Sequence, residues 1–360
     1  MVPQLENVPA DDYRRHVIEL LNSAAQVLFI SIGYKTGLFP TLAGLPPSTS
    51  AQIAAAAGLN ERYVREWLGA VVVSGLVDYD AASQTYALPP ANAMMLVGPA
   101  TPVLAGHFQA VPVLFSTEPA LLECFRAGGG LPYSAFTNFK DSVRVGNENG
   151  DAMLLEDILP ESPGLVDRLQ RGADVGEICC GIGHRLNVMA RAFPSSTFTG
   201  YDFTERSIDR AKAEAVQLGL TNVSFVVQDV SELGLRDVFD VIVGFDAIHD
   251  LAKPRAVLKA VHAALRPGGT FFMADVRASS RLEENMSHVL GPWFYAWSLA
   301  HCMTLSLGQN GEGLGSMWGE ERALQYLSEA GFRDVLVKTK DADLINCYYI
   351  CTKERLENGH

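Results

Sequence analysis

The chain has 360 residues, of which 48% are hydrophobic and 19% are charged. This balance is typical of globular proteins and excludes an intrinsically disordered chain, and the length exceeds what one hydrophobic core usually supports. Two domains are therefore expected. The formal net charge of −13 argues against broad nucleic-acid binding, which depends on clustered lysine and arginine.

The first residues predict a cytoplasmic protein. Residues 1–15 carry two adjacent aspartates and lack the apolar core of a signal peptide. Residues 17–33 are apolar but include Glu19 and Asn22, so they are interpreted as an amphipathic helix and not as a membrane span. None of the six cysteines forms a CxxC pair, so free thiols and no metal site are expected.

Residues 1–98 predict a mainly helical winged-helix domain. Apolar residues recur at helical spacing over residues 17–31, Ser50 is expected to cap a helix over 51–57, and Asn60 a helix over 61–74. A hairpin over residues 76–88, with a polar turn at 80–84, follows as the wing.

Many winged helices bind DNA, but the composition of this segment argues against that function. Residues 49–90 hold two arginines against four acidic residues, a net charge of −2. The helix expected to read DNA also becomes apolar after Trp67, at Leu68 and residues 71–73, where polar side chains would be needed for base edges. The favoured interpretation is that this apolar surface packs against a second subunit.

Residues 99–165 are rich in proline, glycine and aromatic residues and include His107. This composition favours connecting helices that line a pocket over a flexible linker. The pattern then changes to alternating strands and helices, which places the domain boundary near residue 165.

The remaining sequence predicts a parallel, doubly wound sheet of the α/β class. Strands are expected at residues 175–179, 197–201, 223–227, 240–244 and 270–274, with helices over 185–192 and 207–218 and a turn over 265–269. Ligands in such sheets bind at the carboxyl ends of the strands. The polar and glycine residues at those ends are therefore the candidates for a cofactor site.

Each strand end contributes a residue suited to a nucleoside. Gly181 and Gly183 let the backbone approach a ligand closely, and Asp202 can accept hydrogen bonds from two ribose hydroxyls. Asp229 is expected to accept from an adenine amino group. Three apolar residues are expected against the ring faces: Phe203, Val230 and Phe245.

These motifs resemble those of the class I S-adenosylmethionine-dependent methyltransferases over nearly the whole chain. The family's first motif, an acid followed by three alternating glycines, corresponds to residues 177–183, with Glu177 as the acid and Cys179 in place of the first glycine. Residues 30–39 and the winged helix resemble the N-domain of small-molecule methyltransferases, including plant-type O-methyltransferases. The resemblance implies a seven-stranded Rossmann-like domain over residues 166–360, S-adenosylmethionine as cofactor, and a homodimer.

Two rival functions use the same features. A nicotinamide dehydrogenase is one rival, because Asp202 lies close to where the dinucleotide-binding fingerprint has its acid. However, Leu186 stands where that fingerprint has its third glycine. A non-enzymatic regulator would use the winged helix, and the substitution at Cys179 favours it. The methyltransferase interpretation is preferred because four consecutive strand ends fit it.

The acceptor is expected to be a small, partly apolar molecule that bears a hydroxyl, carboxylate or thiol. Residues 277–319 are longer than an ordinary loop and are interpreted as a lid over an acceptor pocket. The residues expected to line this pocket are His107, Trp293, Trp297, His301, Met303 and Trp318. Oxygen and sulfur acceptors are not distinguished.

The resemblance also implies a catalytic pair. Plant-type O-methyltransferases carry a His-Asp pair after the fourth strand, where the histidine is the general base, and this sequence has His249 and Asp250 there. A histidine with an ordinary pKa near 6.5 is largely neutral at pH 7 and can take a proton from the acceptor. Asp250 is expected to orient the ring, and Asp246 is also within reach.

Overall fold

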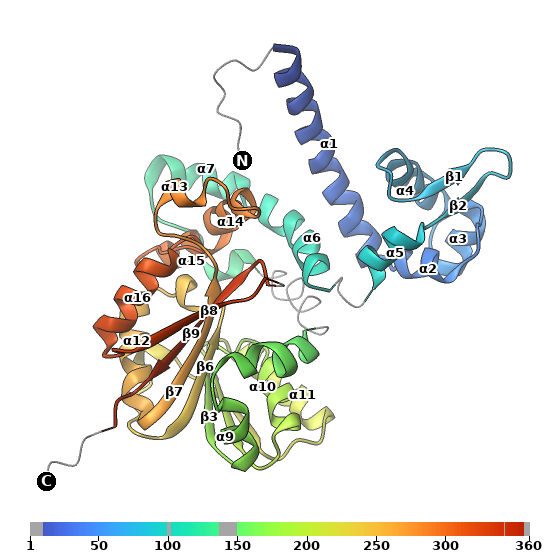
Figure 1. Ribbon diagram of the computed structural model, residues 1–360. Helices are drawn as coiled ribbons and strands as arrows, with labels where there is room; N and C mark the ends of the chain where they lie inside the picture. The colour runs from blue at the N-terminus through green and yellow to red at the C-terminus, as the bar shows by residue number, and fades with distance from the viewer. Residues whose placement is uncertain (1–9, 99–101, 137–149, 342, 356–360) are drawn as a thin grey trace, which may run out of the picture. The chain divides into compact units, whose positions relative to one another are not determined.

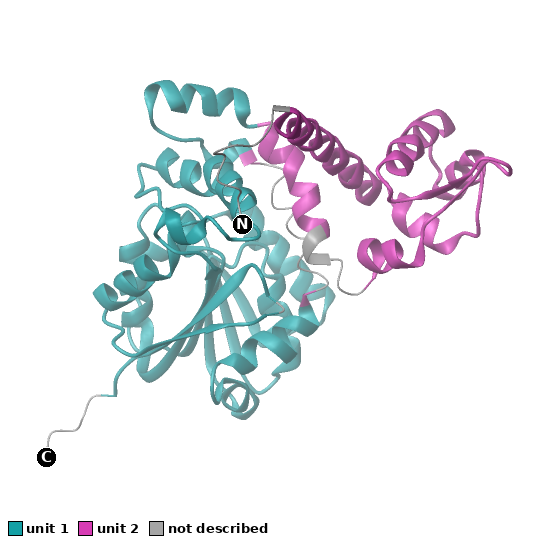
Figure 2. Ribbon diagram, turned by 45° about the horizontal axis from the view of Figure 1, so that its top comes forward, with its two compact units in different colours: residues 1–2, 117–135, 151–360 teal, residues 3–116, 136–150 magenta. Residues whose placement is uncertain are grey.

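The computed structural model describes residues 10–98, 102–136, 150–341 and 343–355, which form two compact units (Figures 1 and 2). One unit runs to Ser116 and includes Phe136, and the other comprises Thr117–Ala135 and the chain from Asp151 onward. The predicted connecting segment, residues 99–165, is thus divided between the two units.

The first unit contains the predicted winged helix. Asn60 caps α4 by accepting a hydrogen bond from the Arg62 backbone N–H at 3.0 Å, as expected. The cap of α3 is Thr49 and not Ser50, because Thr49 and Gln52 form a reciprocal capping box. The elements are α1 Ala10–Lys35, α2 Leu38–Gly44, α3 Ser50–Ala57, α4 Glu61–Val73, β1 Asp78–Asp80, β2 Thr85–Ala87, α5 Pro90–Val97 and α6 Pro102–Phe115.

The apolar end of α4 faces the core of its own unit, which corrects the prediction that residues 71–73 form an exposed patch. Leu68 and Val71 are fully buried, and only Val73 is exposed. Trp67 stacks edge-on against Phe39, and its indole N–H donates to the Phe29 carbonyl at 2.8 Å. The apolar residues at this end of α4 are therefore largely used within the winged helix.

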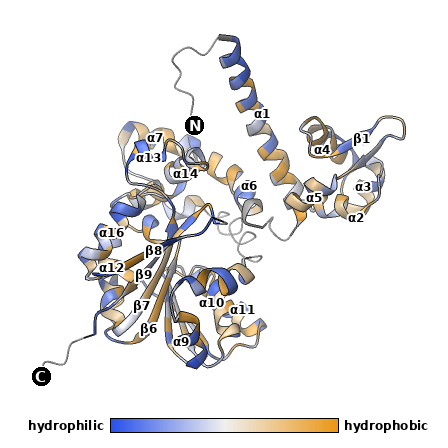
Figure 3. Cartoon of the chain, in the orientation of Figure 1, coloured by the Kyte–Doolittle hydropathy of each residue, from blue (hydrophilic) through white to orange (hydrophobic). Residues whose placement is uncertain are grey.

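Helix α1 carries many apolar residues (Figure 3), and several of their side chains are exposed. By length and composition, Asp11–Lys35 is apolar enough to cross a membrane, and 17% of the apolar window within it is buried. The exposed apolar side chains of α1 are Tyr13, Val17, Ile18, Leu20, Leu21, Leu28 and Ile32.

The second unit is built on a seven-stranded sheet in the order β5-β4-β3-β6-β7-β9-β8, which confirms the predicted Rossmann-like class. All neighbouring strands are parallel except for β9, which is antiparallel to β7 and to β8. The strands are β3 Asp174–Ile178, β4 Thr197–Asp202, β5 Val223–Val227, β6 Phe239–Phe245, β7 Leu265–Val276, β8 Val335–Thr339 and β9 Asn346–Thr352.

Helices cover both faces of this sheet, as its alternating strand residues require. Val175 and Val241 face one layer, whereas Ile178 and Ile242 face the other. The first layer contains α9 Leu165–Arg171, α10 His184–Ala192 and α11 Glu205–Gln217, and the second contains α12 Pro254–Ala264 and α16 Gly319–Ala330.

Strand β7 begins five residues earlier than expected, because the predicted turn at 265–269 pairs with neighbours on both sides. Leu265 pairs with Phe239 of β6, and the Lys353 N–H donates to the Gly269 carbonyl at 3.0 Å. The Arg266 guanidinium stabilises this segment by donating hydrogen bonds to the carboxylates of Asp174 and Asp240, each at 2.8 Å.

The insertion at 277–319 is helical and packs on the loop that follows β6. The Gly315 N–H donates to the His249 carbonyl at 3.2 Å, and the Ser306 hydroxyl donates to the Leu251 carbonyl at 2.8 Å. The insertion contains α13 Leu282–Asn285, α14 Gly291–Trp297, the π-helix η6 Ser298–Cys302 and α15 Met303–Gly308.

Candidate active site

The loop between β3 and α10 has the backbone conformation of a glycine-rich ligand loop. Gly181 and Gly183 have φ of +57° and +71°, and Cys179 has φ of +54°. A Cβ on Gly183 would lie 2.5 Å from both Ala211 and Phe225, whereas a Cβ on Gly181 would meet no atom within 4 Å. Gly183 is thus required for packing, and Gly181 leaves open space beside the loop.

Asp202, at the end of β4, is tied to that loop. Its Oδ2 accepts from the Gly181 backbone N–H at 3.0 Å, and its Oδ1 accepts from the Thr204 N–H at 2.8 Å. The carboxylate is 5% exposed, and each oxygen keeps a second lone pair. The predicted ribose acceptor is therefore held in place by the loop that would carry the cofactor.

The three predicted adenine contacts differ in exposure. Phe203 is 51% exposed with its ring edge-on to Tyr133, whereas Val230 is buried in the core. Phe245 is also buried, with the Arg185 guanidinium 4.8 Å from its ring centroid. Of these three side chains, Phe203 is thus the most accessible to a ligand.

Asp229, at the end of β5, caps the short 3-10 helix η4 Val230–Glu232. Its Oδ1 accepts from the Ser231 backbone N–H at 2.8 Å. This bond uses one lone pair and fixes the orientation of the carboxylate. Its contact with an adenine amino group remains a prediction.

Glu177 is a buried acid without a hydrogen bond at one oxygen. It is 4% exposed, and within the described part of the chain its Oε2 has no hydrogen-bond partner. The pKa of Glu177 is raised to about 8, chiefly by burial. The nearby Arg185 lowers this pKa, and Asp202 raises it. A buried carboxyl with one such oxygen, near the end of β3, fits an ammonium group such as that of methionine.

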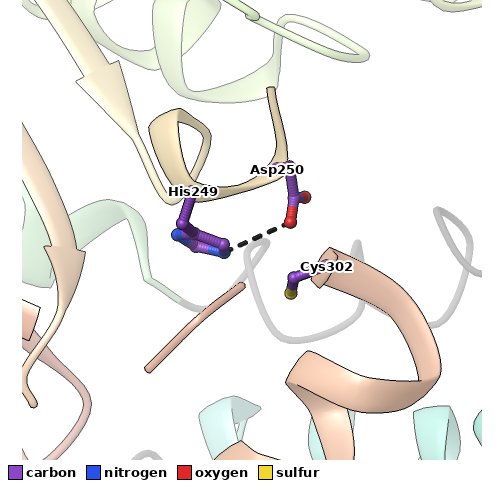
Figure 4. Close-up of side chains that lie close together, drawn as sticks. All are labelled: His249, Asp250 and Cys302. Carbon is purple, nitrogen blue, oxygen red and sulfur yellow. Dashed lines mark ion pairs between the residues drawn. The ribbon is translucent and has the colours of Figure 1, made fainter. Parts of the chain in front are cut away.

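The catalytic pair predicted after β6 lies in the 3-10 helix η5 Ile248–Asp250, and His249 is 4% exposed. His249 Nε2 lies 3.4 Å from Asp250 Oδ1 (Figure 4). The opposite ring nitrogen, Nδ1, lies 2.6 Å from Asp275 Oδ1. Asp275 is therefore the residue that orients the ring through Nδ1.

Asp275 was not among the predicted site residues, although it directly follows the expected strand 270–274. It is fully buried at the end of β7, and its Oδ1 also accepts from the Val276 N–H at 2.7 Å and the Trp318 indole at 3.1 Å. An acid at a strand end was the available signal. Its partner lies 26 residues away, and only the fold brings them together.

The pKa of His249 differs from the ordinary value near 6.5 that the sequence suggests. Burial alone would lower the pKa of His249, but the carboxylates of Asp275 and Asp250 outweigh it and hold the pKa well above the ordinary value. The two carboxylates thus make the ring a stronger proton acceptor than an isolated histidine.

The predicted acceptor residues occupy different places. His301 lies in η6 with Nδ1 3.8 Å from Asp250 Oδ2, so the structure brings it to the predicted catalytic pair. Trp318 is buried and supports Asp275, a role different from the predicted pocket wall. Trp293 and Trp297 stack edge-on in α14 with centroids 5.1 Å apart.

Two further predicted acceptor residues are placed less directly. Met303 begins α15 and is half-buried. His107 belongs to α6 in the other unit, where burial lowers its pKa to about 4. Their contacts with an acceptor remain predictions.

Two family profiles match the chain. Residues 24–97 match the Rv2258c-like winged HTH domain, and residues 169–331 match a methyltransferase domain. The phthiotriol/phenolphthiotriol dimycocerosates methyltransferase of Mycobacterium tuberculosis strain H37Rv is 32% identical over 112 residues, which are 31% of this chain and 40% of that protein. The chain thus matches less than half the length of this curated relative.

Solved structures share the whole fold at low identity. An O-methyltransferase family protein from Burkholderia thailandensis aligns with a TM-score of 0.70 at 16% identity, over 98% of this chain and 100% of that one. Human N-acetylserotonin methyltransferase, solved with S-adenosylmethionine, aligns with a TM-score of 0.66 at 16% identity, over 97% and 99%.

The profile matches and the shared fold confirm the predicted class. The chain combines a domain that matches a winged-helix model with a domain that matches a methyltransferase model, and it shares its fold with a methyltransferase solved with S-adenosylmethionine.

Proposed function

We propose that this chain transfers a methyl group from S-adenosylmethionine to an oxygen or sulfur atom of a small, partly apolar molecule. The observation that carries the proposal is the arrangement at one edge of the sheet. Asp202, bound to the Gly181 N–H, ends one strand, and the His249–Asp275 pair lies at the ends of two others. A nucleoside site and a proton acceptor are thus built on the same strand ends.

The residues at the ends of β3, β4 and β5 fit the cofactor. Asp202 would hold the ribose and Asp229 the adenine amino group, while Glu177, with its unpaired Oε2, would face the methionine ammonium. When bound, S-adenosylmethionine supplies an electrophilic methyl group on its sulfonium sulfur. The open space beside Gly181 is where the loop backbone can approach such a ligand.

His249 would accept the proton that the acceptor loses as it is methylated. Asp275 holds the Nδ1 side of the ring, so Nε2 is the nitrogen available for that proton. A positioned base contributes roughly 10²–10⁴-fold to the rate, and alignment of acceptor and cofactor contributes up to about 7–11 kcal/mol. Alignment of acceptor and cofactor thus contributes more to the rate than the base does. The contribution of His249 should be largest for acceptors that are not already ionised.

The acceptor class rests on the insertion and on the comparisons. Helix α14 presents the Trp293–Trp297 pair, and aromatic surfaces of this kind suit flat or apolar small molecules. The human relative in fold is named for N-acetylserotonin, a small molecule. Hydroxyl, carboxylate and thiol acceptors remain open, and a screen of purified protein against all three classes with labelled S-adenosylmethionine would decide among them.

We also propose that this protein is a cytoplasmic homodimer and that it binds neither nucleic acid nor membrane. The exposed apolar side chains of α1 support a second subunit as the partner of that helix. The net charge of −13 supports the absence of a nucleic-acid partner.

The experiment that tests the catalytic role is His249→Ala. With a neutral acceptor, kcat should fall by about 10²–10⁴-fold while the affinity for S-adenosylmethionine changes little. His262→Ala is a matched control, because His262 packs against Phe332 on the face of the sheet covered by α12 and α16. Near-normal kcat for His249→Ala on a neutral acceptor would remove His249 from the mechanism.

A further inference from the structure

Three potential metal ligands converge beside the proposed reaction centre (Figure 4). They are His249 and Asp250 of η5 and Cys302 at the end of η6. One ligand atom from each lies within 4.8 Å of the other two. His249 and Cys302 are buried and Asp250 is half-buried, so the cluster is not an ordinary solvated surface group.

The hydrogen bond to Asp275 directs the imidazole toward this cluster. Asp275 is fully buried, and the Val276 N–H and the Trp318 indole fix its Oδ1 beside His249 Nδ1. Nε2 is therefore the nitrogen that faces the other two ligands. In metal sites a ligating histidine almost always has a carboxylate or carbonyl behind it in this way, and such partners commonly change metal affinity 10–100-fold.

The charge of the surroundings favours a cation. Asp250 and Asp275 both lie against the single imidazole of His249, and His301 Nδ1 approaches Asp250 only to 3.8 Å. Within the described residues, the buried Oδ2 of Asp275 has no hydrogen-bond partner. The negative charge of these two carboxylates attracts a cation to the cluster, and Zn²⁺ in place of the protons on His249 Nε2 and Cys302 leaves the net charge of the cluster unchanged.

We propose that His249 Nε2, Asp250 and Cys302 Sγ form a binding site for Zn²⁺. One nitrogen, one oxygen and one sulfur ligand suit Zn²⁺ better than Mg²⁺ or Ca²⁺, which prefer oxygen alone. Tetrahedral zinc with ordinary bond lengths places the nitrogen and oxygen ligands about 3.4 Å apart and the sulfur about 3.6 Å from each of them. The 3.4 Å between Nε2 and Asp250 Oδ1 already meets this spacing.

Binding uses lone pairs that the protein otherwise needs. The ion takes the Nε2 lone pair in place of its proton and the Cys302 thiolate in place of its thiol, and both protons pass to the buffer. A nitrogen that holds Zn²⁺ cannot accept a proton from the acceptor. Zn²⁺ is therefore an inhibitor of methyl transfer, a consequence that rests on the proposed function, whereas the binding site itself does not.

Cobalt reports the site directly, because a thiolate bound to Co²⁺ has a strong charge-transfer absorption in the near ultraviolet. Titration of the purified chain with Co²⁺ should give this band at one equivalent, and Zn²⁺ should displace it. In Cys302→Ser the band should vanish and Zn²⁺ affinity should fall at least about 100-fold. Cys124→Ser, on α7 Glu118–Ala127, is the matched control and should keep both.

Each measurement can overturn part of the proposal. A band that persists in Cys302→Ser, or no binding at one equivalent, overturns the site, provided that S-adenosylmethionine binding shows that the variant is folded. Asp275→Asn should weaken Zn²⁺ binding by about 10–100-fold. With a working acceptor, saturating Zn²⁺ should lower kcat at least about tenfold, and a chelator should restore it. Unchanged kcat with Zn²⁺ bound would refute competition for Nε2. A chain without methyl-transfer activity would still show the cobalt band.

Discussion

The buried acid at the end of β3 makes the stability of the ligand-free protein depend on pH in a way that Glu177→Gln should remove. The pKa of Glu177 is raised from 4.5 to about 8, chiefly by burial. The folded protein therefore keeps a proton on this side chain that the unfolded chain releases above about pH 4.5. Because the folded state binds more protons, the free energy of unfolding falls as pH rises from 4.5 to about 8.

The size of the effect follows from the pKa values. One pKa unit corresponds to 1.36 kcal/mol, so between pH 5 and pH 7 the wild type should lose about 2–3 kcal/mol relative to Glu177→Gln. Urea unfolding of both proteins at several pH values measures this difference. Glu123→Gln makes the same chemical change at an exposed site and should follow the wild type.

Parallel curves for the wild type and Glu177→Gln would refute this reasoning, since they would mean that Glu177 is ionised in the folded state. Saturating S-adenosylmethionine provides a second measurement. If Glu177 faces the cofactor's ammonium group, the cation lowers the pKa of Glu177, and the pH-dependent loss of stability should shrink.

Three further predictions concern the cofactor loop and α1. Asp202→Ala should weaken S-adenosylmethionine binding at least about tenfold in titration calorimetry, because charged hydrogen bonds of about 1.5–3 kcal/mol are lost; unchanged affinity would contradict its role. Cys179→Gly should bind the cofactor as tightly as the wild type or more tightly, because φ of +54° suits glycine, and a large loss would reveal a further role for the thiol. The wild type should be a dimer by light scattering, and Ile18→Lys with Leu21→Lys a monomer; a monomeric wild type, or one that binds lipid vesicles, would contradict the proposed partner of α1.

The sheet and its cofactor edge could be predicted because local sequence determines them. The predicted strand at 223–227 has the same bounds as β5, and Asp202 lies at the end of β4, as predicted. The start of β7 was missed because its first residues contain proline and two glycines, which usually indicate a turn. Pairing with β6 and the ion pairs of Arg266 override that local signal.

Two errors in the winged helix were avoidable from the sequence. Three consecutive valines on a helix point in directions 100° apart, so they cannot all lie on one exposed face. Val71 continues the buried spacing of Val64 and Leu68, whereas Val73 points away from it. Likewise, Thr49 and Gln52 form the three-residue spacing of a capping box, a more specific signal than Ser50.

The proton-accepting side of the site could be predicted only in part. The His249–Asp250 pair is contiguous in sequence, but Asp275 and Cys302 approach it from a different strand and from the insertion. No spacing rule relates residues so far apart, because the approach depends on how η6 packs on the loop after β6. The ring's raised pKa was missed for the same reason, since it depends on both carboxylates.

Backbone strain provides an independent reason to place function at these strand ends. Among the described residues, five that are not glycine have positive φ, and two of them, Cys179 and Asp246, directly follow β3 and β6. Such conformations cost about 1–2 kcal/mol each and persist where the surroundings impose them. Asp246 also has a buried Oδ1 without a hydrogen-bond partner in the described structure. Strain at adjacent strands, and an acid with one buried oxygen that accepts no hydrogen bond, are difficult to explain by stability, because both destabilise the fold. They are expected where a bound cation, such as a sulfonium cofactor, offsets the charge.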